Sequence, residues 1–259
     1  MDLAEVGSVG GFFALRTEAP DGPAARGAHG GAYVPFAEIY AGDIAPLSAR
    51  VDTVAGKLGA PERRVAASIA QLGLAARLWS LALGSAALHG EVLDLDPARL
   101  YWNPHRTSPD DLLLPGPRAV PTTTGADAAA RPTITALAGA VREVVQFGHL
   151  VPLAAALRAD GAIAPRLLWG NAGSALAGAV RELRVWSRRS GRPEVGERAD
   201  ALGAVLLTHP DLRATGVPGD GTFRRRSCCL YYRCPSGGLC GDCVFDRPPS
   251  RSSPGEVSG

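Results

Sequence analysis

The chain has 259 residues, of which 46% are hydrophobic, and a formal net charge of +2. This length and hydrophobic content allow a substantial core, so a small fold that depends on disulfide bonds is disfavoured. The nearly balanced charge lacks the strong basic field of a nonspecific nucleic-acid-binding protein, so we expect no nucleic acid among the partners.

The beginning of the chain does not read as a secretory signal, because Met1 to Arg16 carries acidic residues where a basic segment would be needed. The sequence shows no run of about 18 apolar residues, so we expect no transmembrane segment. The simplest expectation is a cytoplasmic protein, in which cysteines stay reduced and can bind metal.

The first half of the chain predicts a lead-in, one long helix and a small sheet. Residues 1–32 are rich in Gly, Ala and Pro, which indicates a loosely ordered lead-in. Short apolar segments at 92–115, between Pro and Asp turn signals, predict two or three strands of a small antiparallel sheet. Between them, from Pro61, apolar residues at helical spacing predict a long helix with a core-facing stripe of Val65, Ile69, Leu72, Ala76, Trp79, Leu83 and Ala86.

Three more helices are predicted after a proline-bounded connector at residues 121–132. Their apolar periodicity places them at about 134–148, 165–188 and 193–208. The expected fold class is therefore α+β, predominantly helical, with residues 33–222 forming the main domain.

The helix at 165–188 contains three glycines, Gly170, Gly173 and Gly178. Each glycine costs about 1 kcal/mol relative to alanine in a helix interior. Close approach of another helix or of a ligand to this face would account for them.

All five cysteines of the chain lie near its C-terminus, at Cys228, Cys229, Cys234, Cys240 and Cys243. Disulfide bonds are disfavoured by the odd number of cysteines and by the reducing compartment expected here. A zinc site and an iron-sulfur centre remain. The adjacent side chains of Cys228 and Cys229 diverge in an extended chain, so both can grip one tetrahedral ion only with strain.

A two-iron cluster relaxes this geometric demand, because it presents two metal atoms that each need two thiolates. Two ligand sets are compatible with the spacing. One is Cys228, Cys229, Cys240 and Cys243; the other replaces Cys228 by Cys234.

The segments Arg225–Arg233 and Gly237–Cys243 resemble the C-terminus of FhuF-like ferric-siderophore reductases, and Leu168–Leu176 resembles a segment of the same family more faintly. The resemblance implies that the C-C-x10-C-x2-C motif holds a 2Fe-2S cluster through Cys228, Cys229, Cys240 and Cys243. It places an iron-sulfur module at residues 223–245. The residues after it, 246–259, are rich in Pro, Ser and Arg and cannot bury apolar area, so we expect a disordered tail there.

The function implied by this resemblance is the one-electron reduction of Fe(III) held by a hydroxamate siderophore, with a ferredoxin-like or other cytoplasmic donor. Hard oxygen ligands hold Fe(II) less well than Fe(III), so reduction frees the iron. No catalytic residue is needed beyond the cluster ligands. The neighbouring arginines, Arg224, Arg225, Arg226 and Arg233, would compensate the negative charge of the cluster or dock an acidic donor.

Two other functions remain open at this point. A 2Fe-2S redox or iron sensor would use the same cluster without turnover. A zinc-bound structural module would use the cysteines only to fix the C-terminal segment.

Overall fold

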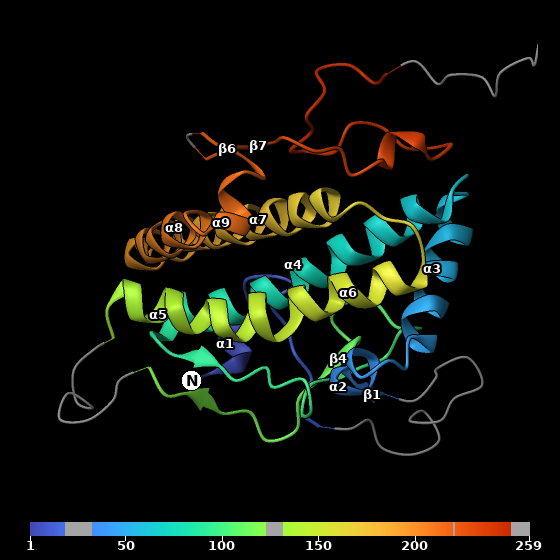
Figure 1. The fold of residues 1–259 in the computed structure, drawn as a ribbon. Coiled ribbons are helices and arrows are strands. Elements are labelled where there is room, and N and C mark those ends of the chain that lie inside the picture. The colour runs from blue at the N-terminus through green and yellow to red at the C-terminus, as the bar shows by residue number, and fades with distance from the viewer. Residues whose placement is uncertain (19–32, 123–131, 220, 250–259) are drawn as a thin grey trace, which may run out of the picture.

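The computed structural model describes residues 1–18, 33–122, 132–219 and 221–249. In these ranges helices pack around one long central helix, and short antiparallel strand pairs lie on two opposite sides of the helices (Figure 1). The predicted fold class, mainly helical with small antiparallel sheets, is confirmed. Part of the expected lead-in, 19–32, and most of the expected tail, 250–259, lie outside the described residues.

The first four helices are α1 Leu3–Gly7, α2 Phe36–Tyr40, α3 Ala45–Leu58 and α4 Arg63–His89. The helix α4 is the centre of the fold and contacts α1, α3, α5, α7 and α8. Every residue from Arg77 to Leu88 is buried. The prediction of a single buried face on this helix was therefore too narrow. Other elements surround α4, so all of its faces are buried in this stretch.

The same helix, α4, meets the length and composition of a membrane-spanning helix, with a mean hydropathy of 1.3 in its most apolar window. In this fold 78% of that window is buried inside the protein, as the core helix of a bundle requires. One ion pair is buried beside α4: Arg77 donates to Asp111 at 3.0 Å.

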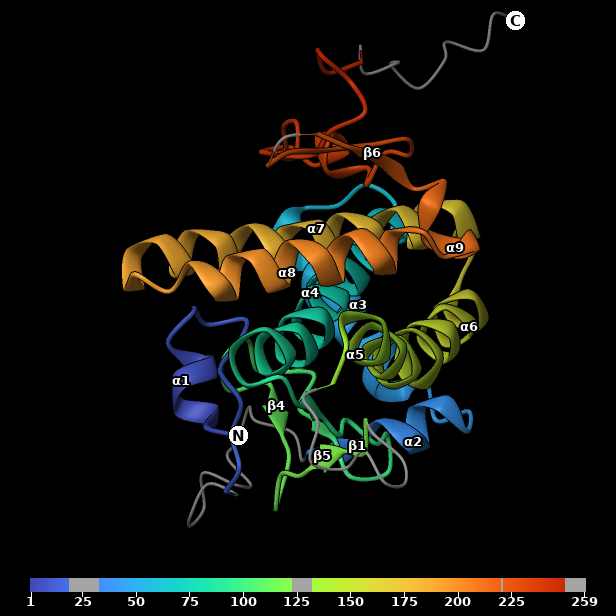
Figure 2. The same cartoon turned by 90° about the vertical axis from the view of Figure 1, so that its left-hand side faces the viewer.

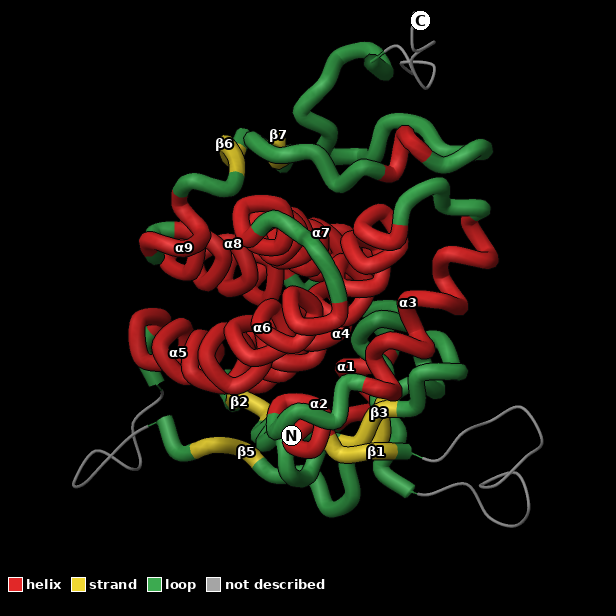
Figure 3. The backbone as a smooth tube through the Cα atoms, turned by 45° about the vertical axis from the view of Figure 1, so that its right-hand side comes forward, coloured by secondary structure: helices red, strands yellow, loops and turns green. Residues whose placement is uncertain are grey.

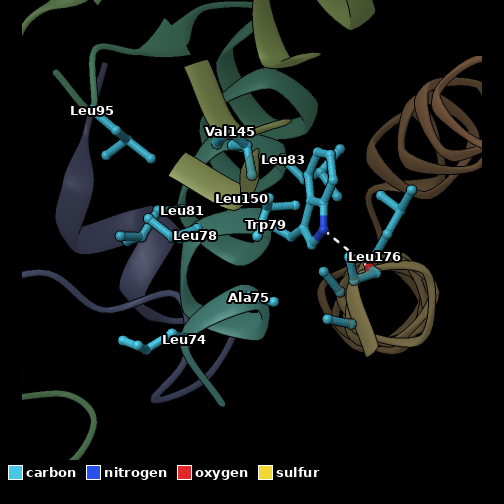
Figure 4. Close-up of a cluster of buried hydrophobic side chains, with 14 of the residues drawn as sticks. Leu74, Ala75, Leu78, Trp79, Leu81, Leu83, Leu95, Val145, Leu150 and Leu176 are labelled. Carbon is cyan, nitrogen blue, oxygen red and sulfur yellow. Dashed lines mark hydrogen bonds between the residues drawn. The ribbon is translucent and has the colours of Figure 1, made fainter. Parts of the chain in front are cut away.

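The later helices are α5 Ile134–Val141, η3 Arg142–Leu150, α6 Val151–Asp160, α7 Pro165–Ser190, α8 Pro193–Leu207 and α9 Pro210–Arg213. The bounds of α7 and α8 are close to those predicted. The helix α7 packs along α4, where the indole Nε1 of the fully buried Trp79 donates to the carbonyl of Ala172 at 3.1 Å (Figure 4). Leu83 and Leu176 belong to the same buried cluster.

The helix predicted at 134–148 continues to Asp160 through a π-helical segment, η3. In a π-helix each N–H donates to the carbonyl five residues earlier. Here the N–H of Val151 donates to the carbonyl of Gln146. Pro152 follows immediately and supplies no N–H to the helix. The helix therefore continues past Pro152, whereas the sequence pattern predicted that it would end near residue 148.

The strands of the first half of the chain lie below the main helices in Figure 3 and form two small separate sheets. Strand β3 Tyr101–Trp102 pairs antiparallel with β1 Val34–Pro35 and with β4 Leu112–Leu113. A second pair joins β2 Val92–Leu93 to β5 Ala119–Val120. The single small sheet predicted around 92–115 is therefore divided in two, with partners outside that range.

The described part of the expected lead-in, residues 1–18, is folded against the core. The side chain of Val6 is fully buried and that of Phe13 is 2% exposed. Arg16 forms a bridge with Leu113, and its guanidinium pairs with Asp110 at 2.5 Å. The Gly, Ala and Pro content of residues 1–32 predicted loose order, but a few apolar residues such as Val6 and Phe13 anchor this segment to the core.

Candidate iron-sulfur centre

The cysteine-bearing segment lies over α7, on the side away from α5 and α6, as the two views in Figure 1 and Figure 2 agree. It begins with an antiparallel hairpin of β6 Gly216–Pro218 and β7 Phe223–Arg225. Because β7 needs β6 as its partner, this unit starts before residue 223, where the sequence pattern placed its boundary.

Two of the three α7 glycines allow the segment to approach this closely. A Cβ atom built on Gly170 would lie 1.9 Å from the Ser227 Oγ, and one on Gly173 would lie 2.1 Å from the Thr215 Oγ1. The close approach expected at these positions is present. The partner is the C-terminal segment and not a helix or a ligand, and Gly178 has no comparably close neighbour.

Backbone N–H groups are directed at two of the sulfur atoms. The N–H of Leu230 donates to Cys228 Sγ at 3.2 Å, and that of Phe245 donates to Cys243 Sγ at 3.4 Å. Leu230 adopts a left-handed conformation with φ of 69°, which is costly for a side chain of this kind. The chain is thus bent sharply after the Cys228-Cys229 pair and enters the short 3-10 helix η4 Tyr231–Arg233.

The thiols of the predicted ligands lie together. A hydrogen bond with Cys229 lowers the pKa of Cys228 to about 7, and the same bond raises the pKa of Cys229. A hydrogen bond with Cys229, together with burial, raises the pKa of Cys240 well above its usual range. Cys243 lies close enough to Cys228 to affect its pKa by charge.

The five cysteines differ in exposure. Cys229 is 2% exposed and Cys234 is fully buried, whereas Cys228, Cys240 and Cys243 are partly exposed. The thiol cluster therefore has an inner side that faces the protein and an outer side that faces solvent.

Arg225 supplies a buried positive charge beside these thiols. Its side chain is 2% exposed, and it favours the thiolate forms of Cys228, Cys229 and Cys240. The guanidinium Nη2 donates to Asn171 Oδ1 at 2.6 Å, while the buried Nε and Nη1 have no partner among the described residues. A buried cation with unpaired donors fits an anionic group at this position.

Asn171 on α7 connects Arg225 to the core. It is fully buried, and its Nδ2 donates to the carbonyl of Ser68 at 2.8 Å and to the hydroxyl at 3.1 Å. The Ser68 hydroxyl in turn donates to the carbonyl of Cys229 at 2.8 Å. We did not predict a site role for Asn171 from the sequence, although a polar residue among the apolar and small residues of α7 was a usable signal.

Asp242 fixes the Cys240-Cys243 turn. The carboxylate is 8% exposed and accepts hydrogen bonds from Ser174 and Arg181 on α7. The other predicted basic neighbours lie further out: Arg224 pairs with Asp246, Arg233 pairs with Glu62, and Arg226 is exposed.

The donor set fits a 2Fe-2S cluster better than a single ion. Four thiols, two sulfur-directed N–H donors and a buried cation are the features that stabilise such an anionic cluster. In the parts of the chain that the structure describes, the Cys, His, Asp and Glu side chains, the five cysteines included, form no ready-made group of three ligands for a metal ion.

This helical fold with a C-terminal four-cysteine site is that of an iron-sulfur protein. Residues 225–245 match the family described as the FhuF 2Fe-2S C-terminal domain, and residues 74–217 match the family described as the ferric iron reductase FhuF-like transporter. The chain belongs to this FhuF-like ferric reductase family, and its cofactor is a 2Fe-2S cluster.

The chain is also similar to the ferric siderophore reductase of Escherichia coli (strain K12). The two sequences are 36% identical over 100 residues, a stretch that covers 37% of each chain. The match thus spans well under two thirds of that relative.

Proposed function

We propose that the protein reduces Fe(III) in a ferric siderophore by one electron, through a 2Fe-2S cluster held by Cys228, Cys229, Cys240 and Cys243. When bound, the cluster supplies one-electron chemistry at a fixed potential. The observation that carries the proposal is the contact of three of these thiols in the segment that holds Arg225, whose buried Nε and Nη1 have no partner among the described residues. Family membership supports the same activity.

This ligand set is favoured over the one with Cys234 by three features. Cys228 is hydrogen-bonded to Cys229, and its sulfur accepts the Leu230 N–H. The fully buried Cys234 follows η4, and its Cβ packs near Gly237. We propose that residues 223–245 hold the cluster, together with their hairpin partner β6, and that the helices before β6 support them.

A pocket beside the module offers a place for the ferric chelate. Its volume is about 340 Å³, within the range of small-molecule sites, and Asp242 forms part of its wall. The rest of the wall comes from residues 9–13, α4 and α7. We place a hydroxamate siderophore here, because the pocket borders the turn between Cys240 and Cys243, two residues that are partly exposed.

A second pocket beside the module suits an acidic electron donor. It has a volume of about 300 Å³, and its charged lining residues are Arg166, Arg226 and Asp211, which give two positive charges and one negative charge. Arg166 and Arg226 are exposed, and complementary charge steers the docking of an acidic protein. We propose a ferredoxin-like donor at this pocket, and a cytoplasmic site of iron release.

The test is a single-turnover reaction of the anaerobically reduced protein with a ferric hydroxamate, followed by the appearance of Fe(II) trapped by a chelating dye. The expected result is reoxidation of the protein in step with Fe(II) release, faster than in a sample without chelate. Reoxidation at the rate of the chelate-free control would reject the reductase and favour the sensor. A Gly178→Leu variant, which adds bulk to the pocket wall, should slow the reaction with the cluster intact.

A further inference from the structure

We infer that Arg225 is the buried counter-charge of the cluster, that Asn171 positions it, and that this pair raises the reduction potential of the cluster. The inference rests on the proposed ligand set. The sequence pattern gave the role of charge compensation to four arginines, and the structure assigns it to Arg225 alone.

Arg225 is unlike a normal buried arginine, because no carboxylate pairs with it among the described residues. Its side chain is 2% exposed, and only Nη2 has a hydrogen-bond partner, the Asn171 Oδ1. An uncompensated buried charge is strongly destabilising. A cluster held by the neighbouring cysteines would supply the compensating negative charge.

Arg225 lies next to the turn that carries Cys240 and Cys243. Arg225 acts by charge on Cys228, Cys229 and Cys240, and its backbone N–H donates to the carbonyl of Asp242 at 2.9 Å. Reduction adds one negative charge to the cluster. A fixed cation in a site of low dielectric stabilises the reduced state more than the oxidised state, so it makes reduction more favourable.

Asn171 determines where the guanidinium lies. Its Nδ2 is held by the carbonyl and hydroxyl of Ser68, which turns Oδ1 toward Arg225. A Cβ built on Gly170 would lie 3.1 Å from the Arg225 Nη2, so the glycine leaves room for it. The Ser68 hydroxyl also holds the carbonyl of Cys229, so one buried network positions both the cation and a ligand.

The neighbouring arginines are less suited to this role. The side chain of Arg224 is 56% exposed and pairs with Asp246, and that of Arg233 is 37% exposed and pairs with Glu62. Arg226 is exposed to solvent. Water and salt screen such charges, whereas a buried charge keeps its effect at high ionic strength.

The experiment is a spectroscopic redox titration of the full chain at low and high salt. The variants are Arg225→Gln, Arg225→Lys and Asn171→Asp, with Arg226→Gln as the matched control from the adjacent position. We expect Arg225→Gln to reduce the equilibrium constant for reduction about tenfold, which is a shift of about 59 mV to more negative potential. Asn171→Asp should shift it in the same direction, because a carboxylate then neutralises the guanidinium, and Arg225→Lys should retain most of the potential.

The control should change the potential by much less, and its effect should vanish at high salt. Equal shifts in Arg225→Gln and Arg226→Gln, or no shift in Arg225→Gln, would overturn the inference. If Arg225→Gln loads no cluster, the potentials of Arg225→Lys and Asn171→Asp decide the question in the same way.

A second readout uses the cluster-free protein. There Arg225 is an uncompensated buried cation, so Arg225→Gln should leave the melting temperature unchanged or raise it, while it lowers that of the loaded protein. If Arg225→Gln lowers the melting temperature equally in the cluster-free and the loaded protein, the role of Arg225 is purely structural. A wild-type protein without a cluster would reject the proposed function itself, whereas a loaded wild type with an unchanged variant potential would reject only this inference.

Discussion

The hydroxyl of Ser174 on α7 donates a 2.5 Å hydrogen bond to the carboxylate of Asp242, which lies between Cys240 and Cys243. Arg181 donates to the other carboxylate oxygen at 3.3 Å, and the carbonyl of Asp242 accepts the N–H of Arg225. One side chain in the turn between two proposed ligands therefore ties the module to α7. The turn is therefore anchored by two side chains of α7.

Replacing Asp242 by alanine should loosen the module. The change leaves the largely buried hydroxyl of Ser174 without its acceptor, which costs about 1–3 kcal/mol, and we expect the iron content of the purified protein to fall. The matched control is Asp246→Ala, since that carboxylate is 82% exposed and pairs with Arg224. It should change the unfolding free energy by less than about 1 kcal/mol. Equal iron retention in both variants would contradict this role of Asp242.

The glycines of α7 give a second prediction. Gly173→Ala should destabilise the protein by about 1–3 kcal/mol, because its Cβ would lie 2.9 Å from the Cβ of Thr215. Gly178→Ala should instead stabilise it by about 0.5–1 kcal/mol through helix propensity, since the nearest atom is 3.8 Å away. Urea denaturation of both variants measures the difference. Changes of the same sign would show that the module does not dock here.

A buried histidine on η3 predicts acid sensitivity. The Nε2 of His149 lies 2.5 Å from the carbonyl of Leu95, and its Nδ1 lies 2.8 Å from the Tyr40 hydroxyl. We assign the neutral tautomer in which Nε2 donates and Nδ1 accepts. Burial lowers the pKa of His149 to about 4.

The sign of the pH effect follows from this pKa. Between pH 6.5 and 4 the unfolded chain binds a proton that the folded protein excludes, so stability falls as the pH falls. The contribution is fully present above pH 6.5 and amounts to roughly 3 kcal/mol. Chemical denaturation of the cluster-free protein across this range should show the slope, and His149→Gln should flatten it. An unchanged slope in His149→Gln, or an equal effect of replacing the exposed His105, would refute the assignment.

The sequence predicted the elements that have strong periodicity. The start of α4 and the bounds of α7 and α8 follow from apolar spacing and from the prolines Pro61, Pro165 and Pro193. The cysteine spacing together with the family resemblance predicted the module. These features are local, so they can be read without knowledge of the fold.

The features that were missed or misjudged depend on contacts between distant segments. The small residues of α7 predicted a close neighbour, but only the fold identifies it as the segment that carries Thr215 and Ser227. Arg225 is one of three consecutive arginines, and nothing in its local sequence separates it from Arg224 or Arg226. Only Arg225 is buried and hydrogen-bonded to Asn171, whereas Arg224 and Arg226 are exposed. Burial depends on the packing of the module against α7, which the local sequence does not reveal.

The most direct test of the central claim is metal and sulfide analysis of the anaerobically purified chain, with paramagnetic resonance after one-electron reduction. The account predicts two iron and two sulfide per chain, with a rhombic signal that Cys234→Ser retains and Cys240→Ser loses. Stoichiometric zinc without iron, or loss of the signal in Cys234→Ser, would contradict it.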